Sequence, residues 1–416
     1  MNNNTKNKRM KSSYSKSGGL GGLMKLSCFV CALVFAWSFV GDNFCAVKAE
    51  AKSAISSSYT EKNKSEKEES KSKSGVDIPE PDFELSDVFY YYTSLSGEEL
   101  KIYKLMLQGM NSHEESILLP ANIENKLRPI YDMVRNDHPE LFWVDNGFSY
   151  YKYSDRTVLM PDYNRTKEES EGEEWEIYTA LHSFRGTLSE EDSDYDVIRK
   201  AYLYIIDTVD YVDGSSDNQN IISALVNGQS VCAGYARAFQ YLLQNSGIQS
   251  FYVHGNSLND DGWGSHAWNI VRCGDKYYHV DTTYGDDIDN EKMLSMGIHN
   301  YSYLCIDDAS VSRDHEISDD LPVPECNSLD LNYYVMNGRY FDYYDDSVVS
   351  SLYNSVYNGE YYWSCQFSNY DAYAACLADI SAENGLYARA VSEYICDASY
   401  IYYNYYGNTY TIICYY

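Results

Sequence analysis

Apolar residues recur at helical spacing in the middle of this 416-residue chain. Residues 233–245 carry one such stripe, and Gly247 just beyond it is a natural helix stop. The stripe consists of Tyr235, Phe239, Leu242 and Leu243. Residues 197–208 are expected to form a buried helix ahead of it. The pattern predicts two consecutive helices, the second beginning at Cys232.

Alternating polar and apolar positions follow, which predict two strands. Residues 266–272 and 276–283 alternate, and the dipeptide Gly274-Asp275 between them favours a tight turn. The pattern therefore predicts a β-hairpin in which Cys273 faces Lys276.

The two-residue loop also sets the register of this hairpin. Trp268 then lies opposite Asp281, and His266, on the same face as Trp268, is the diagonal neighbour of Asp281. A three-residue loop would place His266 and Asp281 on opposite faces. The even loop therefore predicts that this imidazole and this carboxylate approach one another.

The chain ahead of this central part mixes helical and strand-like patterns. Residues 98–108 and 123–136 have helical periodicity, whereas the aromatic stretches 147–153 and 157–160 alternate as strands do. We therefore expect an N-terminal α/β region over residues 81–187.

The last part of the chain has a similar mixture. Strand-like runs over residues 361–367, 400–405 and 409–414 are separated by helix-like ones. This order predicts a tyrosine-rich C-terminal α/β module over residues 328–416, which leaves residues 188–327 as the central core.

The first 80 residues predict export. Six basic residues precede a 15-residue apolar run over residues 26–40, and the small residues of Val47-Lys48-Ala49 suit a signal peptidase. The run is shorter than the about 20 residues of a membrane span, so residues 1–49 are predicted to be a signal peptide, with an uncleaved anchor as the alternative. Residues 50–80 are predicted to be a disordered linker, because 18 of residues 51–75 are Ser, Lys or Glu. The protein is expected to be secreted or held at the cell surface.

Loss of this leader would leave a strongly acidic chain. The leader holds 7 of the 32 basic residues and 1 of the 62 acidic ones, which leaves 25 against 61 and a net charge of −36. This charge argues against nucleic acid as a partner. It favours solubility outside the cell, with attraction for cationic substrates as the alternative. The 45 tyrosines suit glycan or peptide binding, but they equally suit strands without a ligand.

Three core residues have the chemistry of a thiol enzyme. Cys232 stands at a predicted helix start, where unpaired amides and the helix dipole favour a thiolate. In the predicted hairpin Asp281 can orient His266, whose other nitrogen then faces the Cys232 helix. This is the nucleophile, base and orienting group of acyl-transfer enzymes. Each residue alone has an ordinary structural explanation; only the combination favours catalysis.

The motifs around these residues resemble the transglutaminase-like superfamily in its bacterial secreted form. The resemblance rests on Val231-Cys-Ala-Gly-Tyr-Ala, His266-Ala-Trp-Asn and His279-Val-Asp-Thr-Thr, and it extends from about Tyr195 to Asp287. It implies an α+β fold with a papain/transglutaminase-like core, in which the cysteine helix packs on an antiparallel sheet. The N-terminal and C-terminal α/β modules would flank this core.

The same resemblance assigns roles to the site residues. It implies that Cys232 is the nucleophile, that His266 is the general base and acid, and that Asp281 orients the imidazole. There are three further candidates. Gln229 is a candidate oxyanion donor, Trp268 is a ring behind the site, and Tyr284 stands where many relatives carry Trp.

Two other elements carry histidines. His279 lies two residues before Asp281, on the same face of a regular strand, and is a candidate neighbour of the site. Asp314-His315 resembles a recurrent element of the bacterial relatives, but the sequence assigns it no chemistry. The mature chain has no Cys-x-x-Cys pair, no His-Glu-x-x-His and no glycine-rich phosphate loop, so we expect no metal and no cofactor.

These observations predict a secreted cysteine enzyme that attacks amide bonds in proteins or peptides through an acyl-enzyme on Cys232. Resolution by water would make it a peptidase or amidase, which the resemblance favours, whereas resolution by a lysine amine would make it a crosslinking transglutaminase. A non-catalytic surface-binding module and an arylamine acetyltransferase-like enzyme are further alternatives. The expected partner is a protein or peptide substrate, or a cell-wall component. A membrane would be reached only through an uncleaved N-terminal segment.

Cysteine pairing stays open. Eight cysteines remain after the leader, and reserving Cys232 leaves an odd number, so at least one more must be unpaired. Four of them gather in the C-terminal module, where one or two disulfides would suit an exported protein: Cys365, Cys376, Cys396 and Cys414.

Overall fold

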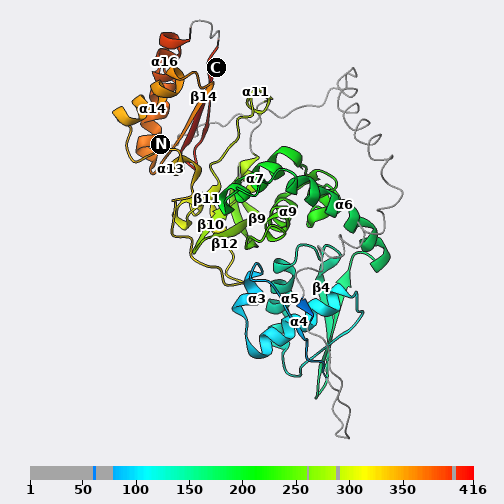
Figure 1. Cartoon of the computed structure of the whole chain (residues 1–416). Helices are drawn as coiled ribbons and strands as arrows, with labels where there is room; N and C mark the ends of the chain where they lie inside the picture. The colour runs from blue at the N-terminus through cyan, green and yellow to red at the C-terminus, as the bar shows by residue number, and fades with distance from the viewer. Residues whose placement is uncertain (1–59, 62–77, 260–261, 287–290, 396–399) are drawn as a thin grey trace, which may run out of the picture. The chain divides into compact units, whose positions relative to one another are not determined.

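The computed structural model describes residues 60–61, 78–259, 262–286, 291–395 and 400–416 (Figure 1). The predicted signal segment, residues 1–49, and most of the predicted linker lie outside the described residues. Within the linker, β1 (Thr60–Glu61) pairs with β2 (Phe83–Glu84). Among the described helices, none has the length and apolar character needed to cross a membrane.

A five-stranded antiparallel sheet forms the centre of the core (Figure 1). Its order is β11-β10-β9-β8-β12, with bounds Leu304–Ile306, Lys276–Val280, Gly262–Cys273, Ser250–Asn259 and His315–Ile317. Residues 266–271 of β9 are all buried, because helix α9 (Cys232–Gln244) packs against this part of the sheet. The core is therefore α+β, with the cysteine helix on an antiparallel sheet, as predicted.

The two predicted helices are confirmed. Helix α7 (Asp194–Thr208) begins with a capping box in which Ser193 and Asp196 satisfy each other's backbone amides, and it packs on α9. Helix α9 starts at Cys232, and Gly247 follows its end with φ +82°. The short helix α8 (Ile221–Leu225) and a parallel strand pair, β6 (Asp210–Tyr211) with β7 (Gln229–Ser230), lie between α7 and α9 in sequence.

The hairpin register is also confirmed, up to its last residue. Lys276 pairs with Cys273 and Val280 pairs with Asn269, as the two-residue loop predicts. Strand β10 ends at Val280, however, so Asp281 does not pair with Trp268. Asp281 instead becomes the N-cap of α10 (Thr282–Gly285), because its side chain accepts hydrogen bonds from the first amides of that helix.

The N-terminal region contains the predicted helices α4 (Gly97–Asn111) and α5 (Glu124–Asp137). Its strands β3 (Ile117–Leu119), β5 (Thr157–Tyr163) and β4 (Val144–Lys152) form one antiparallel sheet in that order. Helices α3 (Tyr90–Ser94) and α6 (Lys167–Arg185) complete it. A single buried cluster runs from Val88 to Tyr334, so this region and the central core share one hydrophobic interior.

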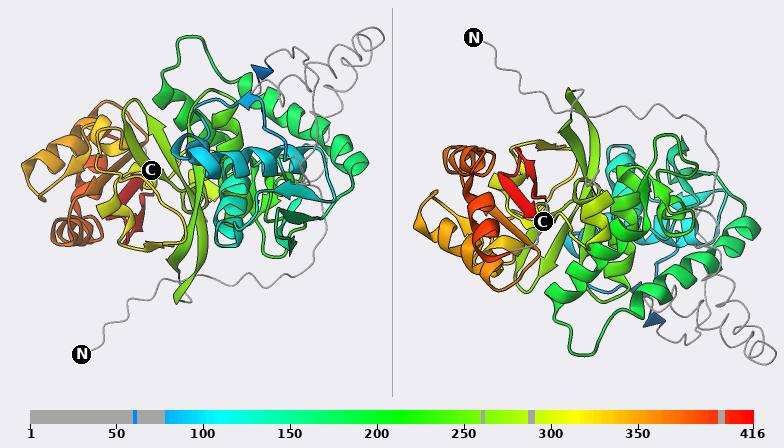
Figure 2. Two further views of the ribbon diagram at one scale, coloured as in Figure 1. Left: turned by 90° about the horizontal axis from the view of Figure 1, so that it is seen from below. Right: turned by 90° about the horizontal axis from the view of Figure 1, so that it is seen from above.

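The C-terminal residues build a second buried cluster, from Val348 to Cys414. The sheet order is β13-β14-β16-β15, with bounds Tyr340–Phe341, Tyr362–Phe367, Thr411–Tyr415 and Tyr402–Tyr406. Helices α14 (Asp346–Tyr357) and α15 (Tyr370–Ile380) pack against β14, and α16 (Leu386–Tyr394) packs on both helices (Figure 2). The three strands predicted here are present.

The cysteines of this module are not paired as the sequence suggested. Cys365, Cys376 and Cys414 are all buried free thiols, and Cys396 lies outside the described residues. Packed in the second cluster, these thiols act as small apolar side chains.

Candidate active site

Cys232 is the first residue of α9, and its side chain is partly exposed. The first amides of a helix have no acceptor within the helix, so they favour negative charge at this position. Gly234 lets this first turn approach the preceding segment closely, because a Cβ there would collide with the hydroxyls of Ser230 and Ser223. The nucleophile candidate is thus held at a tightly packed helix start.

His266 lies on β9 between Cys232 and Asp281. Its Nε2 is 2.6 Å from Oδ2 of Asp281, and the Cys232 side chain is near enough to the ring to contribute to its raised pKa. Because Nε2 is directed to the carboxylate, Nδ1 is the nitrogen left for the thiol. The structure therefore brings the three residues together in the order that their chemistry requires.

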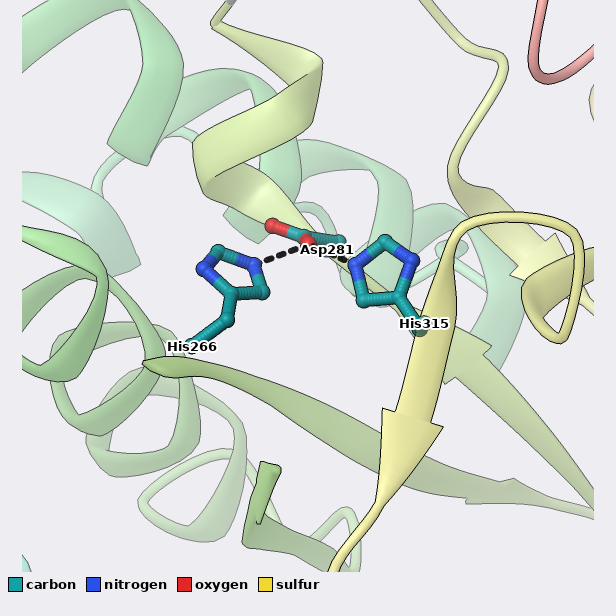
Figure 3. A group of neighbouring side chains, drawn as sticks. All are labelled: His266, Asp281 and His315. Atoms are coloured by element: carbon teal, nitrogen blue, oxygen red, sulfur yellow. Dashed lines mark hydrogen bonds and ion pairs between the residues drawn. The ribbon is translucent and has the colours of Figure 1, made fainter. Parts of the chain in front are cut away.

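Asp281 accepts four hydrogen bonds, and Figure 3 shows the two that come from imidazole rings. Oδ1 receives the backbone amides of Thr283 at 2.8 Å and Tyr284 at 3.0 Å. Oδ2 receives His266 at 2.6 Å and a second imidazole, His315, at 3.0 Å. Four donors occupy the four lone-pair sites of the carboxylate, so Asp281 has no place for a proton and stays ionised.

Charge and burial act against each other in this cluster. Burial lowers the pKa of His266, but the charge and hydrogen bond of Asp281, together with the nearby Cys232 side chain, outweigh it and raise the pKa to about 10. Burial raises the pKa of Asp281, but the two imidazoles outweigh it and hold that pKa well below its usual range. The pair is therefore imidazolium and carboxylate at neutral pH.

Sequence reasoning assigned no chemistry to His315. Strand β12 pairs with β8, which places His315 opposite Ser257 and its ring against Asp281 (Figure 3). Its Nδ1 lies 2.6 Å from Oδ1 of Asp314. The only signal in the sequence was the Asp314-His315 dipeptide itself, which names no partner.

Trp268 and Tyr284 surround the His266 ring. The Trp268 ring is stacked 5.9 Å from it at 17°, and the Tyr284 ring is stacked 4.9 Å from it at 23°. The Tyr284 hydroxyl donates to Ser257 Oγ at 2.9 Å or to Leu258 O at 3.2 Å, which holds the ring in place. These rings limit the orientations that the imidazole can adopt.

His279 contacts Trp268 rather than Asp281. Trp268 Nε1 donates to Nδ1 of His279 at 3.1 Å, and Nε2 of His279 lies 2.8 Å from Oδ1 of Asp308. Because Nδ1 accepts, the ring hydrogen is on Nε2 and is donated to Asp308. His279 thus supports the site through the indole.

Polar groups beside Cys232 come from the β6–β7 pair. Gln229, on β7, has an exposed side chain three residues before the cysteine. Tyr211, on β6, is half exposed, and burial together with the nearby Cys232 raises its pKa to about 12. Its hydroxyl therefore keeps its proton at neutral pH, and it is a donor candidate that the sequence had not singled out.

Two described groups have the donor types of a metal site: His266 with Asp281 and His315, and His279 with Asp308 and Cys326. In the first group both imidazoles already hydrogen-bond Oδ2 of Asp281. In the second, the Trp268 hydrogen bond leaves the hydrogen of His279 on Nε2, so this nitrogen offers no lone pair to a cation. Hydrogen bonds between these residues explain why the members of each group lie close together.

The core matches a known family. Residues 183–282 match the family model of the transglutaminase-like superfamily, and these residues include all three members of the Cys232, His266 and Asp281 group. They form a transglutaminase-like core. The match supports a cysteine-based enzyme in general terms, and it agrees with the resemblance seen in the sequence motifs.

Two solved structures have low similarity to the chain. The crystal structure of a TGase is 15% identical, with a TM-score of 0.26 over 35% of this chain and 46% of its own. A candidate cysteine protease from Cytophaga hutchinsonii is 14% identical, with a TM-score of 0.23 over 33% of this chain and 61% of its own. The chain thus covers less than two thirds of either structure. No curated protein matches it.

The geometry of the transglutaminase-like core suits acyl transfer. A thiol at a helix start can attack a carbonyl carbon, and an imidazolium beside it can protonate a departing amine. Asp281 keeps that imidazole in one orientation without taking its proton, since its four acceptor positions are occupied.

Proposed function

We propose that this chain is an exported cysteine enzyme that hydrolyses amide bonds in proteins or peptides through Cys232. The observation that carries the proposal is the position of His266, whose ring is hydrogen-bonded to Asp281 at 2.6 Å and is near enough to Cys232 for that side chain to raise its pKa. Export rests on the charged and apolar pattern of residues 1–49. The family match supports the cysteine chemistry.

In the proposed first step the Cys232 thiolate attacks the substrate carbonyl. The backbone amide of Cys232 is one candidate donor to the oxyanion, and Gln229 or Tyr211 is the candidate for the second. His266 then gives its proton to the amine as the C–N bond breaks, which leaves a thioester on Cys232.

In the second step a nucleophile resolves the thioester. Neutral His266 accepts a proton from water as the water oxygen attacks, and the acid product leaves as the thiolate forms again. A lysine amine in place of water would give a crosslink instead. Cys232 is partly exposed and Tyr211 is half exposed, and a site that is not closed off from solvent favours water as the nucleophile.

The deciding experiment is incubation of the full chain with casein and monodansylcadaverine. We expect new N-termini in casein and little incorporation of the amine. Efficient labelling of glutamines without cleavage would replace hydrolysis by crosslinking. Cys232→Ser should abolish either activity, whereas Cys273→Ser, at another partly exposed cysteine, should retain it. Full activity of Cys232→Ser would reject the proposal.

A further inference from the structure

We propose that His315 is a positioning residue of this site, an imidazolium held between Asp281 and Asp314. It holds the Asp281 carboxylate in place, and its positive charge partly offsets the effect of the Asp281 negative charge on His266. The inference rests on the proposed function for its catalytic meaning. The geometry on which it depends is independent of any substrate.

The first observation concerns the two nitrogens of His315. Nε2 lies 3.0 Å from Oδ2 of Asp281, and Nδ1 lies 2.6 Å from Oδ1 of Asp314. A neutral imidazole has only one N–H, so one of these contacts would bring two lone pairs together. With both nitrogens protonated, each contact becomes a charge-assisted hydrogen bond.

The second observation is that both carboxylates have their other oxygen occupied. Asp281 Oδ1 receives two backbone amides. Asp314 Oδ2 receives the hydroxyl of Tyr303 at 2.5 Å, and burial together with the charge of Asp314 raises the pKa of Tyr303 well above its usual value. Both carboxylates thus already accept hydrogen bonds at their other oxygen, and each turns its remaining oxygen towards a nitrogen of His315, an arrangement that suits a ring with hydrogen on both nitrogens.

The third observation is the burial of the cluster. Asp281, Asp314 and His315 are 2%, 1% and 3% exposed, so an unmatched charge among them would be costly. With His315 charged, two carboxylates face two imidazolium rings. Burial lowers the pKa of His315, but Asp281 and Asp314 outweigh it and raise the pKa above its usual value.

The titratable groups that face the His315 ring come from β9, β10, α10 and the segments before β11 and β12: His266, His279, Asp281, Tyr284, Tyr303 and Asp314. The rings of His315 and His266 are 5.2 Å apart. A positive charge at this distance disfavours a second imidazolium. His315 therefore makes His266 a better proton donor than Asp281 alone would allow.

The test is a titration of His266 by ¹⁵N NMR in the full chain labelled at histidine. His315→Gln keeps an amide donor for Asp281 but removes the charge. We expect the midpoint of His266 to rise by about one pH unit. His299→Gln removes a histidine that pairs with Asp207 at the surface, and it should leave the midpoint unchanged. An unchanged or lower midpoint in folded His315→Gln would overturn the inference.

Two further measurements cover a variant that fails to fold. In the unaltered protein both ring nitrogens of His315 should carry hydrogen at pH 8, and a neutral ring there would overturn the inference. Asp314→Asn removes one of the two carboxylates that keep His315 charged, so it should move the His266 midpoint in the same direction as His315→Gln. These measurements need no substrate. If the His266 midpoint shifts in a protein that cleaves no substrate, the proposed hydrolase is rejected, but the inference that His315 lowers the His266 midpoint stands.

Discussion

His266 and Asp281 meet at 2.6 Å although 15 positions separate them, because the β9–β10 hairpin folds back on a two-residue loop. The carboxylate lies just beyond the last strand residue, where it also caps α10. One side chain therefore ends a strand, starts a helix and orients an imidazole. Changes at Asp281 should accordingly affect the start of α10 as well as the orientation of His266.

Asp281→Asn should lower kcat/KM on an amide substrate by about 10³–10⁴. The amide has only one oxygen, so it cannot both cap α10 and accept from two imidazoles. Steady-state kinetics on the folded variant measures the effect. Asp275→Asn, in the exposed turn of the same hairpin, should retain activity within about twofold. Equal losses in both variants would mean that the hairpin, and not the carboxylate, matters.

Protein stability should decline in alkali because of His266. Its pKa is about 10 in the folded protein and about 6.5 in an unfolded chain, so a raised pKa stabilises the fold. This contribution is complete below about pH 6.5 and is lost as the pH rises towards 10. Thermal unfolding followed from pH 6 to 10 should give a falling Tm for the unaltered protein and a flatter profile for His266→Gln. Parallel profiles would contradict the raised pKa.

Trp268→Phe should destabilise the protein by about 1–3 kcal/mol while it lowers activity less than tenfold. Phenylalanine retains a ring beside His266 but leaves Nδ1 of the buried His279 without its donor. Urea unfolding gives the free-energy difference. The matched control is Trp263→Phe on the same strand, where the side chain is 50% exposed and a change within about 0.5 kcal/mol is expected.

Gly255→Ala should displace β12 and, with it, His315. A Cβ at this position would collide with the backbone carbonyl of Glu316 on the neighbouring strand, so the strands could no longer pair at their present distance. We expect a loss of about 2 kcal/mol or more in the free energy of unfolding and a higher His266 midpoint. Gly264→Ala on β9 has room for the methyl group and should be tolerated. Similar stability of the two variants would contradict the close packing of β8 and β12.

Much of this site follows from local sequence patterns. The apolar stripe after Cys232 determined where α9 begins, and the even loop at Gly274-Asp275 determined the face that His266 shares with Asp281. Both features depend on residues close in sequence, where the periods of helix and strand constrain the answer. The end of β10 at Val280 was not predicted, because the side chain of Asp281 competes for the backbone amides that would have continued the strand.

Only the tertiary structure decided what Asp281 binds besides His266. His315 reaches the carboxylate from 34 positions away because β12 pairs with β8, and no period in the sequence specifies that pairing. The same holds for the indole of Trp268, whose partner proved to be His279. Sequence periodicity orders residues along one element, whereas hydrogen bonds between elements depend on how those elements pack, and packing is decided by the whole buried cluster.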